Sequence, residues 1–319
     1  MSLLPSIYTV ESVTKGHPDR VCDQIADRIL HEITSQDSKA RVAVEVFGCK
    51  GVVTIGGEVT THATVDYEGL AREVLENVGY DPVEFRLHMN QQSPQIGAAV
   101  SDGGAGDQGI MYGYATADTA SHLPLGVDLA RGLTSRLEEL RESGEVPWLK
   151  SDGKSQVTIR NGAPEVIVVS TQHHSGRSID EVRHRLVQEV HSFVDRQNYV
   201  PHVSKVLINP AGSWSIGGFH ADSGLTGRKL AVDGYGGILP GGGGSTHGKD
   251  NSKVVRSATH KAREVAVDLV SRGLARECLI SVAYAIGVNE PVMLHAINEE
   301  REDITSLLDP AVFLASKLR

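Results

Sequence analysis

The chain has 319 residues, which exceeds one ordinary domain and predicts two or three folded units. Hydrophobic residues make up 40% and charged residues 22%, as in an ordinary globular protein, while the net charge of −9 argues against general affinity for nucleic acid, which needs a basic field. The three cysteines (Cys22, Cys49, Cys278) are widely spaced and indicate neither a disulfide framework nor a zinc site.

Helical and extended segments alternate along the chain. The first helix is expected over 17–35, because Val21, Ile25, Ile29 and Ile33 recur at i+4 spacing and Pro18 suits a first helical turn. Similar apolar spacing predicts helices over 66–78, 126–141, 179–194 and 251–272. Alternation and short apolar runs predict strands over 41–47, 52–60, 156–160, 166–171, 205–208 and 279–286. The first two are expected to form a hairpin through 48–51, and Asn161-Gly162 is a hairpin turn signal between 156–160 and 166–171.

Two strands followed by a helix recur at least twice, which predicts an α+β fold of layered sheet and helix. We expect Asp250 or Asn251 to cap the helix over 251–272. No sequence repeat is strong enough to prove duplication, and the glycine fingerprints of Walker or Rossmann type are absent. The glycines of 51–57 follow a strand but open no helix, so they do not fit a dinucleotide site.

The segment 222–250 carries the strongest chemical signal. It reads DSGLTGRK at 222–229 and GGGGSTHGKD at 241–250, and it combines glycines with Arg228, Lys229 and Lys249. Glycines let a backbone approach a ligand and turn its N–H groups toward an anion, and the cations then supply charge at phosphate oxygens. The alternative is a glycine-rich surface linker, but linkers seldom include bulky residues such as Leu225 and Tyr235. The segment therefore predicts a polyphosphate site.

A second signal lies at the start of the first helix, in ESVTKGHPDR at 11–20. His17 and Asp19 stand at a helix N-terminus, where the helix dipole favours a bound anion and a carboxylate can hold Mg²⁺. An N-terminal cap and a dipole-satisfying charge explain the same two residues equally well.

Three further segments are weaker. GGAGDQGIMYGY at 103–114 predicts a tight loop near a ligand around Asp107, and SDGKSQV at 151–157 leads into a strand that carries Lys154. Glu45 and Glu58 lie on neighbouring strands. A solvated charge on a strand is the alternative for Lys154, and a solvated sheet face is the alternative for the two glutamates.

As a set, these motifs resemble the S-adenosylmethionine synthetase (methionine adenosyltransferase) family. The resemblance extends from about Tyr8 to about Pro291 and includes GHPDR at 16–20, GAGDQG at 104–109, KSQV at 154–157 and the two motifs of 222–250. It implies three similar βαββαβ-type units around a pseudo-threefold axis, the last one abbreviated, and a dimer with active sites between subunits. The expected boundaries are 1–12 plus about 125–220 for two interleaved units, 13–124 for the N-terminal unit with a mobile loop over 92–104, and 221–319 for the C-terminal unit.

The resemblance also assigns roles to single residues. It implies catalytic roles for His17, Lys154, Arg228, Lys229 and Lys249. The ATP-binding positions would be His17, Asp152, Gly153, Lys154, Ser155, Ser213, Trp214, Asp222, Arg228, Lys229, Ser245 and Lys249. The methionine site would comprise Glu58, Gln92, Asp222 and Lys253, with Asp19 as a Mg²⁺ ligand, Glu45 as a K⁺ ligand, and Glu11 and Asp107 as further motif residues.

The activity implied by this resemblance is ATP:L-methionine S-adenosyltransferase. Methionine sulfur attacks C5′ of ATP, and the triphosphate is then cleaved to pyrophosphate and phosphate. The implied cofactors are about two Mg²⁺ per site and K⁺. The implied partners are ATP, L-methionine and a second copy of the chain, with a dimer of dimers left open and neither nucleic acid nor a membrane involved. His17 and Asp19 are expected from one subunit, and the cluster around Arg228 from the other.

The chain departs from the family pattern in several places. Arg20 replaces lysine, Gln95 and Val255 replace acidic residues, Trp214 replaces phenylalanine and Thr246-His247 replaces Phe-Ser. The loop after Gln95 is short, and the C-terminus is expected to be shortened. These departures leave two alternatives open: a nucleotide-binding regulatory homologue with weakened catalysis, and a synthetase with a broadened range of nucleotides or methionine analogues.

The expected location is cytoplasmic. No apolar run reaches the roughly 18 residues of a membrane helix, and the N-terminus lacks the basic start and apolar core of a signal peptide.

Overall fold

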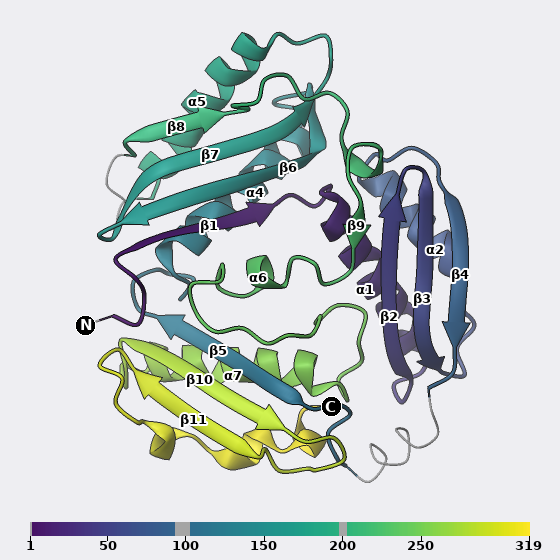
Figure 1. Ribbon diagram of the computed structural model, residues 1–319, viewed down its shortest axis with the longest axis vertical. Coiled ribbons are helices and arrows are strands. Elements are labelled where there is room, and N and C mark those ends of the chain that lie inside the picture. Colours follow the sequence, from purple (N-terminus) through teal and green to yellow (C-terminus); the bar gives the residue numbers. More distant parts are fainter. Residues whose placement is uncertain (1, 93–102, 198–202) are drawn as a thin grey trace.

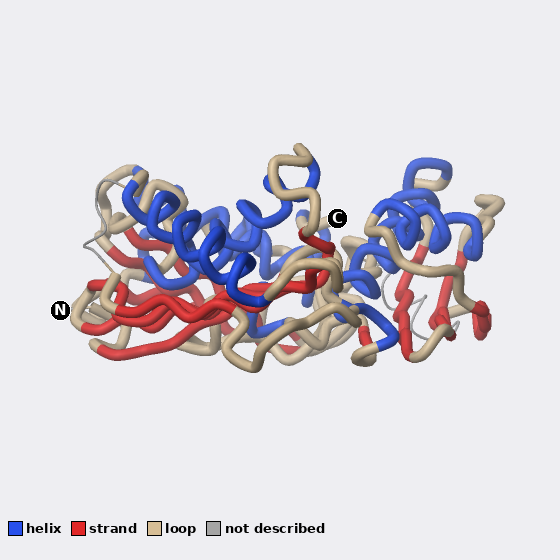
Figure 2. Tube along the Cα trace, turned by 90° about the horizontal axis from the view of Figure 1, so that it is seen from above, coloured by secondary structure: helices blue, strands red, loops and turns tan. Residues whose placement is uncertain are grey.

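The computed structural model describes residues 2–92, 103–197 and 203–319. Three β-sheets lie around a centre that is filled by the segment 226–250, and each sheet carries its own helices (Figure 1). Seen from above, the helices gather on one side of the molecule and the strands on the other (Figure 2). The expected α+β architecture of three sheet-and-helix units is confirmed.

The first sheet has the order β4-β3-β2-β9. Its strands are β2 (Arg41–Cys49), β3 (Val52–Thr60), β4 (Glu84–Asn90) and the short β9 (Gly224–Leu225), and its helices are α1 (Pro18–Gln36) and α2 (Tyr67–Asn77). The expected hairpin of β2 and β3 is antiparallel, and β3 pairs with β4 in parallel. Alternating side chains such as Val42, Val44 and Ile55 are buried with the i+4 stripe of α1. The opposite face of this sheet, which we call the outer face, carries polar and exposed side chains.

The second sheet has the order β1-β6-β7-β8. Its strands are β1 (Ile7–Val13), β6 (Leu149–Arg160), β7 (Ala163–His173) and β8 (Lys205–Ile208), and α4 (Leu125–Glu142) and α5 (Ile179–Asp195) belong to the same unit. Asn161 and Gly162 both have positive φ, which is the turn chemistry expected between β6 and β7. Because β1 pairs with β6, the start of the chain and the segment 149–208 form one unit.

The third sheet has the order β11-β10-β5 and packs against α7 (Val254–Ser271). Its strands are β5 (Gly109–Thr116), β10 (Glu277–Tyr284) and β11 (Met293–Asn298). Three short 3-10 helices, Thr305–Leu307, Pro310–Phe313 and Ala315–Lys317, follow. The fully buried Phe313 belongs to the core of this unit. The central segment contains one short helix, α6 (Leu230–Asp233).

The sheets divide the chain differently from the predicted boundaries. β5 lies inside the predicted unit 13–124, yet all eight of its residues pair with β10 in the third sheet. β9 lies inside the predicted unit 221–319, yet it pairs with Phe47 and Gly48 of β2. Long-range antiparallel pairing decides these memberships, and local spacing in the sequence does not reveal it.

The last long helix begins later than predicted. α7 starts at Val254 with Lys253 at its N-cap, and no side chain caps it. Asp250 does not cap the helix, because its carboxylate accepts hydrogen bonds from the backbone of Val42 (2.6 Å) and of Ser252 (2.9 Å). This carboxylate ties the glycine-rich segment to β2 instead.

Candidate active site

The first component of the site is the N-terminus of α1. His17 is the N-cap residue, is 4% exposed, and accepts a hydrogen bond at Nδ1 from the backbone N–H of Asp19 (3.2 Å). Burial, reinforced by the charge of Lys229, lowers the pKa of His17 to about 4. The imidazole is therefore neutral near pH 7, and since Nδ1 is an acceptor, Nε2 carries the proton. This histidine is a neutral hydrogen-bond donor.

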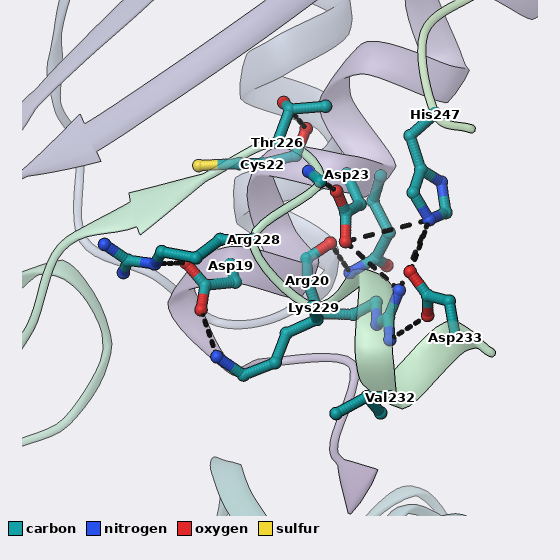
Figure 3. A network of polar contacts seen from close by, with 12 residues as sticks. Asp19, Arg20, Cys22, Asp23, Thr226, Arg228, Lys229, Val232, Asp233 and His247 are labelled. Atoms are coloured by element: carbon teal, nitrogen blue, oxygen red, sulfur yellow. Dashed lines mark hydrogen bonds and ion pairs between the residues drawn. The ribbon is translucent and has the colours of Figure 1, made fainter. Parts of the chain in front are cut away.

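Asp19 binds both cations of the segment that follows β9. Its Oδ1 lies 2.7 Å from Nε of Arg228, and its Oδ2 lies 2.6 Å from Nζ of Lys229 (Figure 3). Oδ1 also accepts the backbone N–H of Leu225 (3.0 Å). Burial alone would raise the pKa of Asp19, but the hydrogen bonds from Lys229 and Leu225 and the charge of Arg228 lower it below its usual value. One ionised, fully buried carboxylate thus positions two cations beside His17.

Asp152 and Lys154 reach the same place from the second sheet. Asp152 is 2% exposed, and its Oδ2 accepts the backbone N–H of Gly218 (2.8 Å). Its Oδ1 is buried and has no hydrogen-bond partner among the described residues. Burial raises the pKa of Asp152 to about 6, against the charge of Lys154, and the charge of Asp222 adds to the rise. Lys154 and Asp222 also influence the pKa of His17, so these side chains face a common space.

Four more ATP-binding positions implied by the resemblance lie on or next to the strand that carries Asp152 and Lys154. Ser213 contacts Nε2 of His173 (3.3 Å), which also accepts the backbone N–H of Trp214 (3.1 Å). The indole N–H of Trp214 donates to the carbonyl of Ile216 (2.7 Å), which fixes the ring plane. Gly153 pairs with Thr171 in the sheet. The fourth, Ser155, is 1% exposed and donates to the carbonyl of Ala130 on α4 (2.7 Å), so its side chain is committed to the core.

A second group of predicted residues lies on the outer face of the first sheet. Glu58 of β3 pairs with Ala43 of β2, and Ala43 in turn forms a bridge with Lys249, so Glu58 and Lys249 flank β2 on one face. Glu45, two residues along β2, is exposed on the same face. Phe47 on this face is 44% exposed. We call Glu45, Glu58 and Lys249 the outer-face group.

The remaining predicted residues lie at the edges of these groups. Ser245 packs against Gly227, where a Cβ atom would lie too close to Cβ of Ser245, and the φ of 76° at this position also favours glycine. Lys253 is 8% exposed at the start of α7. The backbone N–H of Gln92 donates to Thr60 (3.2 Å). Asp107 accepts from the backbone of Gln108 (2.8 Å), and Glu11 is exposed on β1 opposite Gln156.

The structure contradicts one expectation about the subunits, and a second expectation falls on residues outside the described ranges. Arg228 was expected from a different subunit than Asp19, but the two are ion-paired within one chain, because β9 pairs with β2 and places Arg228 beside the start of α1. The loop expected over 92–104 falls largely on residues 93–102, which lie outside the described residues, as does Gln95.

Sequence reasoning assigned no role to several residues that support the site. Tyr80 donates from its hydroxyl to the carbonyl of Gly16 (2.7 Å) and so steadies the His17 turn. Asp23, Asp27, Asp233 and His247 form a partly buried polar network beside Asp19. Figure 3 shows three of its members, Asp23, Asp233 and His247. The i+4 spacing of Asp19, Asp23 and Asp27 on one helix face was the available signal for this network.

The residues present fit a magnesium ion in one respect. Magnesium in nucleotide enzymes is held by one or two carboxylates together with substrate phosphates and water, and Asp19 supplies one buried, ionised carboxylate between two cationic side chains. Both of its oxygens contact Arg228 or Lys229, so metal binding requires one of these cations to turn toward phosphate. Val255 is 8% exposed and offers no ligand.

Comparisons with known proteins cover nearly the whole chain. Residues 5–101 match the family described as S-adenosylmethionine synthetase, N-terminal domain; residues 102–214 match its central domain and residues 216–309 its C-terminal domain. An S-adenosylmethionine synthase of Desulforudis audaxviator is 42% identical over 330 aligned positions, which cover 92% of this chain and 84% of that protein. S-adenosylmethionine synthase 1 of Rhodospirillum rubrum is 45% identical over 304 aligned positions, which cover 90% of this chain and 79% of that protein.

Proposed function

The chain belongs to the S-adenosylmethionine synthetase family, and we propose that it transfers the adenosyl group of ATP to the sulfur of L-methionine. The observation that carries the residue-level proposal is the ionised Asp19 with Arg228 and Lys229 on its two oxygens, beside the neutral His17.

The chemistry explains why cations matter more than bases at this site. The nucleophile is a neutral thioether, so no proton has to be removed before attack on C5′. The departing group is a triphosphate on which negative charge accumulates. Catalysis therefore consists of alignment and of electrostatic stabilisation of the departing polyanion. Positive charge comes from Arg228, Lys229 and Lys154 beside His17, and from Lys249 of the outer-face group.

His17 donates to the oxygen that leaves C5′. A histidine with a pKa of about 4 is uncharged at neutral pH, and the proton on Nε2 is available as a hydrogen bond that strengthens as charge develops on the oxygen. Asp152 receives a ribose hydroxyl or a nearby donor of ATP at its unpartnered Oδ1. Trp214, held through its indole N–H, offers a flat surface for the adenine ring.

Methionine binds at the outer-face group together with Gln92, Asp222 and Lys253. Glu58 pairs with the α-amino group, and Lys253 with the α-carboxylate. The triphosphate is later cleaved to pyrophosphate and phosphate. Mg²⁺, when bound, would supply positive charge that neutralises phosphate oxygens. Asp19 is the residue that would hold Mg²⁺, and Glu45 the one that would hold K⁺.

We place the complete site at the interface of a homodimer. The support is that the outer-face group lies on a sheet face with Phe47 and Leu225, which are 44% and 38% exposed. The residues His17, Asp19, Arg228 and Lys229, which we call the Asp19 group, lie on the other side of β9. The partner subunit would bring its outer-face group to this chain's Asp19 group. A cytoplasmic location accords with three free cysteines. None of the described helices is both long and apolar enough to span a membrane.

Product analysis tests this proposal. The purified protein is incubated with ATP, L-methionine, Mg²⁺ and K⁺, and the mixture is analysed by mass spectrometry for S-adenosylmethionine, pyrophosphate and phosphate. All three products are expected, with no S-adenosylmethionine when methionine is omitted. Asp19→Asn serves as the matched variant, since it keeps the shape of the side chain and loses its charge. An Asp19→Asn protein as active as wild type would remove Asp19 from the site.

A further inference from the structure

His247 lies between three carboxylates that come from two helices. Its Nδ1 is 2.6 Å from Oδ2 of Asp27 on α1. Its Nε2 is 3.1 Å from Oδ2 of Asp233 on α6 and 3.8 Å from Oδ2 of Asp23 on α1 (Figure 3). A carboxylate oxygen only accepts when ionised, so contacts at both ring nitrogens require a proton on each. The ring is therefore an imidazolium in this arrangement.

The network around this ring is balanced in charge. Arg20 reaches Asp23 (3.1 Å) and Asp233 (2.6 Å), and Arg256 of α7 reaches Asp27 (3.1 Å). Three carboxylates thus face two guanidinium groups and His247. Burial alone would lower the pKa of His247, but hydrogen bonds to Asp233 and Asp27 together with the charge of Asp23 raise it to about 10. His260 of α7 also lies close enough for the charges of Arg256, Asp27 and His247 to influence its pKa, and the charges of Asp233 and Arg20 influence the pKa of Arg131 on α4.

The same cluster contains residue types that bind metal ions. One ligand atom each from Asp23, Asp233 and His247 lies within 4.8 Å of the others. A metal ion there would have to displace the guanidinium of Arg20 and the proton of the imidazolium, both of which already neutralise the carboxylates. The contacts favour an ion-pair network over a metal centre.

The network holds the two segments that carry the phosphate-binding cations. On one side, Asp27 accepts the backbone N–H of Gly248 (2.9 Å), and Gly248 accepts the N–H of Val44 (2.9 Å), directly before Lys249. On the other side, Asp23 accepts the backbone N–H of Gly227 (2.8 Å), directly before Arg228 and Lys229. His247 contacts both aspartates, so it connects the position of Lys249 to that of the Arg228 segment.

Building on the proposed function, we propose that His247 is a positioning residue, whose imidazolium holds the glycine-rich segment against α1 and α6. It thereby fixes Arg228 and Lys229 for the triphosphate bound at this chain's Asp19 and Lys249 for the triphosphate bound in the second site of the dimer. The serine expected in this place from the family resemblance is too short to contact both helices and carries no charge. Without the imidazolium, three carboxylates face two guanidinium groups, and the excess negative charge both loosens the segment and repels the polyphosphate.

The first test measures binding of inorganic tripolyphosphate by titration calorimetry, which does not depend on turnover. His247→Gln should weaken binding about fivefold or more, since a side chain without charge leaves a carboxylate uncompensated. His184→Gln, a change of an exposed histidine on α5, should leave binding unchanged. Asp233→Asn added to His247→Gln restores the balance of charge and should recover most of the affinity. Failure of this double variant to recover would overturn the electrostatic role.

The second test uses the wild-type protein and stays decisive if His247→Gln does not fold. Histidine ring nitrogens are labelled with ¹⁵N and followed by NMR between pH 6 and pH 9. His247 should remain an imidazolium throughout this range while exposed histidines lose a proton. A ring that is neutral at pH 8.5, or a folded His247→Gln protein with affinity equal to wild type, would overturn the inference alone. A wild-type protein that neither binds tripolyphosphate nor forms product would overturn the proposed function, and this inference with it.

Discussion

Replacing Lys229 by methionine tests the proposed electrostatic role of its positive charge. The Nζ of Lys229 lies 2.6 Å from Oδ2 of Asp19, and its charge is the second cause, after burial, that lowers the pKa of His17. Lys229→Met keeps the length and apolar stem of the side chain but removes its charge. The change should therefore affect transition-state stabilisation and the protonation of His17 together, while the backbone stays in place.

The expected loss in turnover follows from the role of the charge. Removing one group that stabilises a developing negative charge costs about 3 kcal/mol, so kcat should fall about 10²-fold or more. The KM for methionine should change little, since Lys229 belongs to the phosphate end of the site. Asp19 keeps its ion pair with Arg228, so the loss in unfolding free energy should stay below the roughly 3–5 kcal/mol of a fully broken buried pair.

The pH profile provides an independent readout. Without Lys229, the pKa of His17 should rise from about 4 toward its usual value, so the acid side of the kcat profile should move to higher pH. Steady-state kinetics from pH 5 to pH 9 and urea unfolding measure the two effects, with Lys205→Met, a change of an exposed lysine on β8, as the matched control. If Lys229→Met kept both the turnover and the acid limb of wild type, the assignment of Lys229 to the departing triphosphate would be refuted.

Three further outcomes are expected. The pKa of Asp152 in the folded protein, about 6, lies above its value in the unfolded chain, so the free energy of unfolding should fall as pH rises from about 4 to 6. Asp152→Asn should abolish this fall and raise the free energy of unfolding at pH 7.5 by up to about 3 kcal/mol in urea titrations. The same variant should bind ATP more weakly. Phe47→Glu on the outer face should give an inactive monomer by light scattering; an active monomer would exclude a shared site. A re-dimerised mixture of inactive His17→Asn and inactive Glu58→Gln proteins should regain about a quarter of wild-type activity, because half of the dimers then contain one intact site, and a mixture that stays inactive would place both residues in the same half of the site.

The sequence predicted the local elements well, because they depend on short-range periodicity. The stripe of Val21, Ile25, Ile29 and Ile33 marked α1, and Asn161-Gly162 marked the turn between β6 and β7. What local patterns could not reveal is which strands pair at long range. β5 with β10 and β9 with β2 are pairings between segments far apart in the chain, and they set the division into units.

The candidate site shows the same limit. Motifs identified Asp19, Arg228 and Lys229 individually, but only the pairing of β9 with β2 shows that they meet within one chain. The burial of Asp152 with an unpartnered oxygen, and the commitment of Ser155 to the carbonyl of Ala130, depend on which way each side chain of β6 points. The balance of charge around His247 required three separate segments to come together, and no single motif contained it.

The central claim is that methionine sulfur attacks C5′ and expels the triphosphate with its oxygen. ATP labelled with ¹⁸O at the oxygen between C5′ and the α-phosphorus tests it directly when methionine, Mg²⁺ and K⁺ are present. The account predicts unlabelled S-adenosylmethionine, with all of the ¹⁸O recovered in pyrophosphate or phosphate. Absence of S-adenosylmethionine, or label retained in an adenosine product, would contradict it.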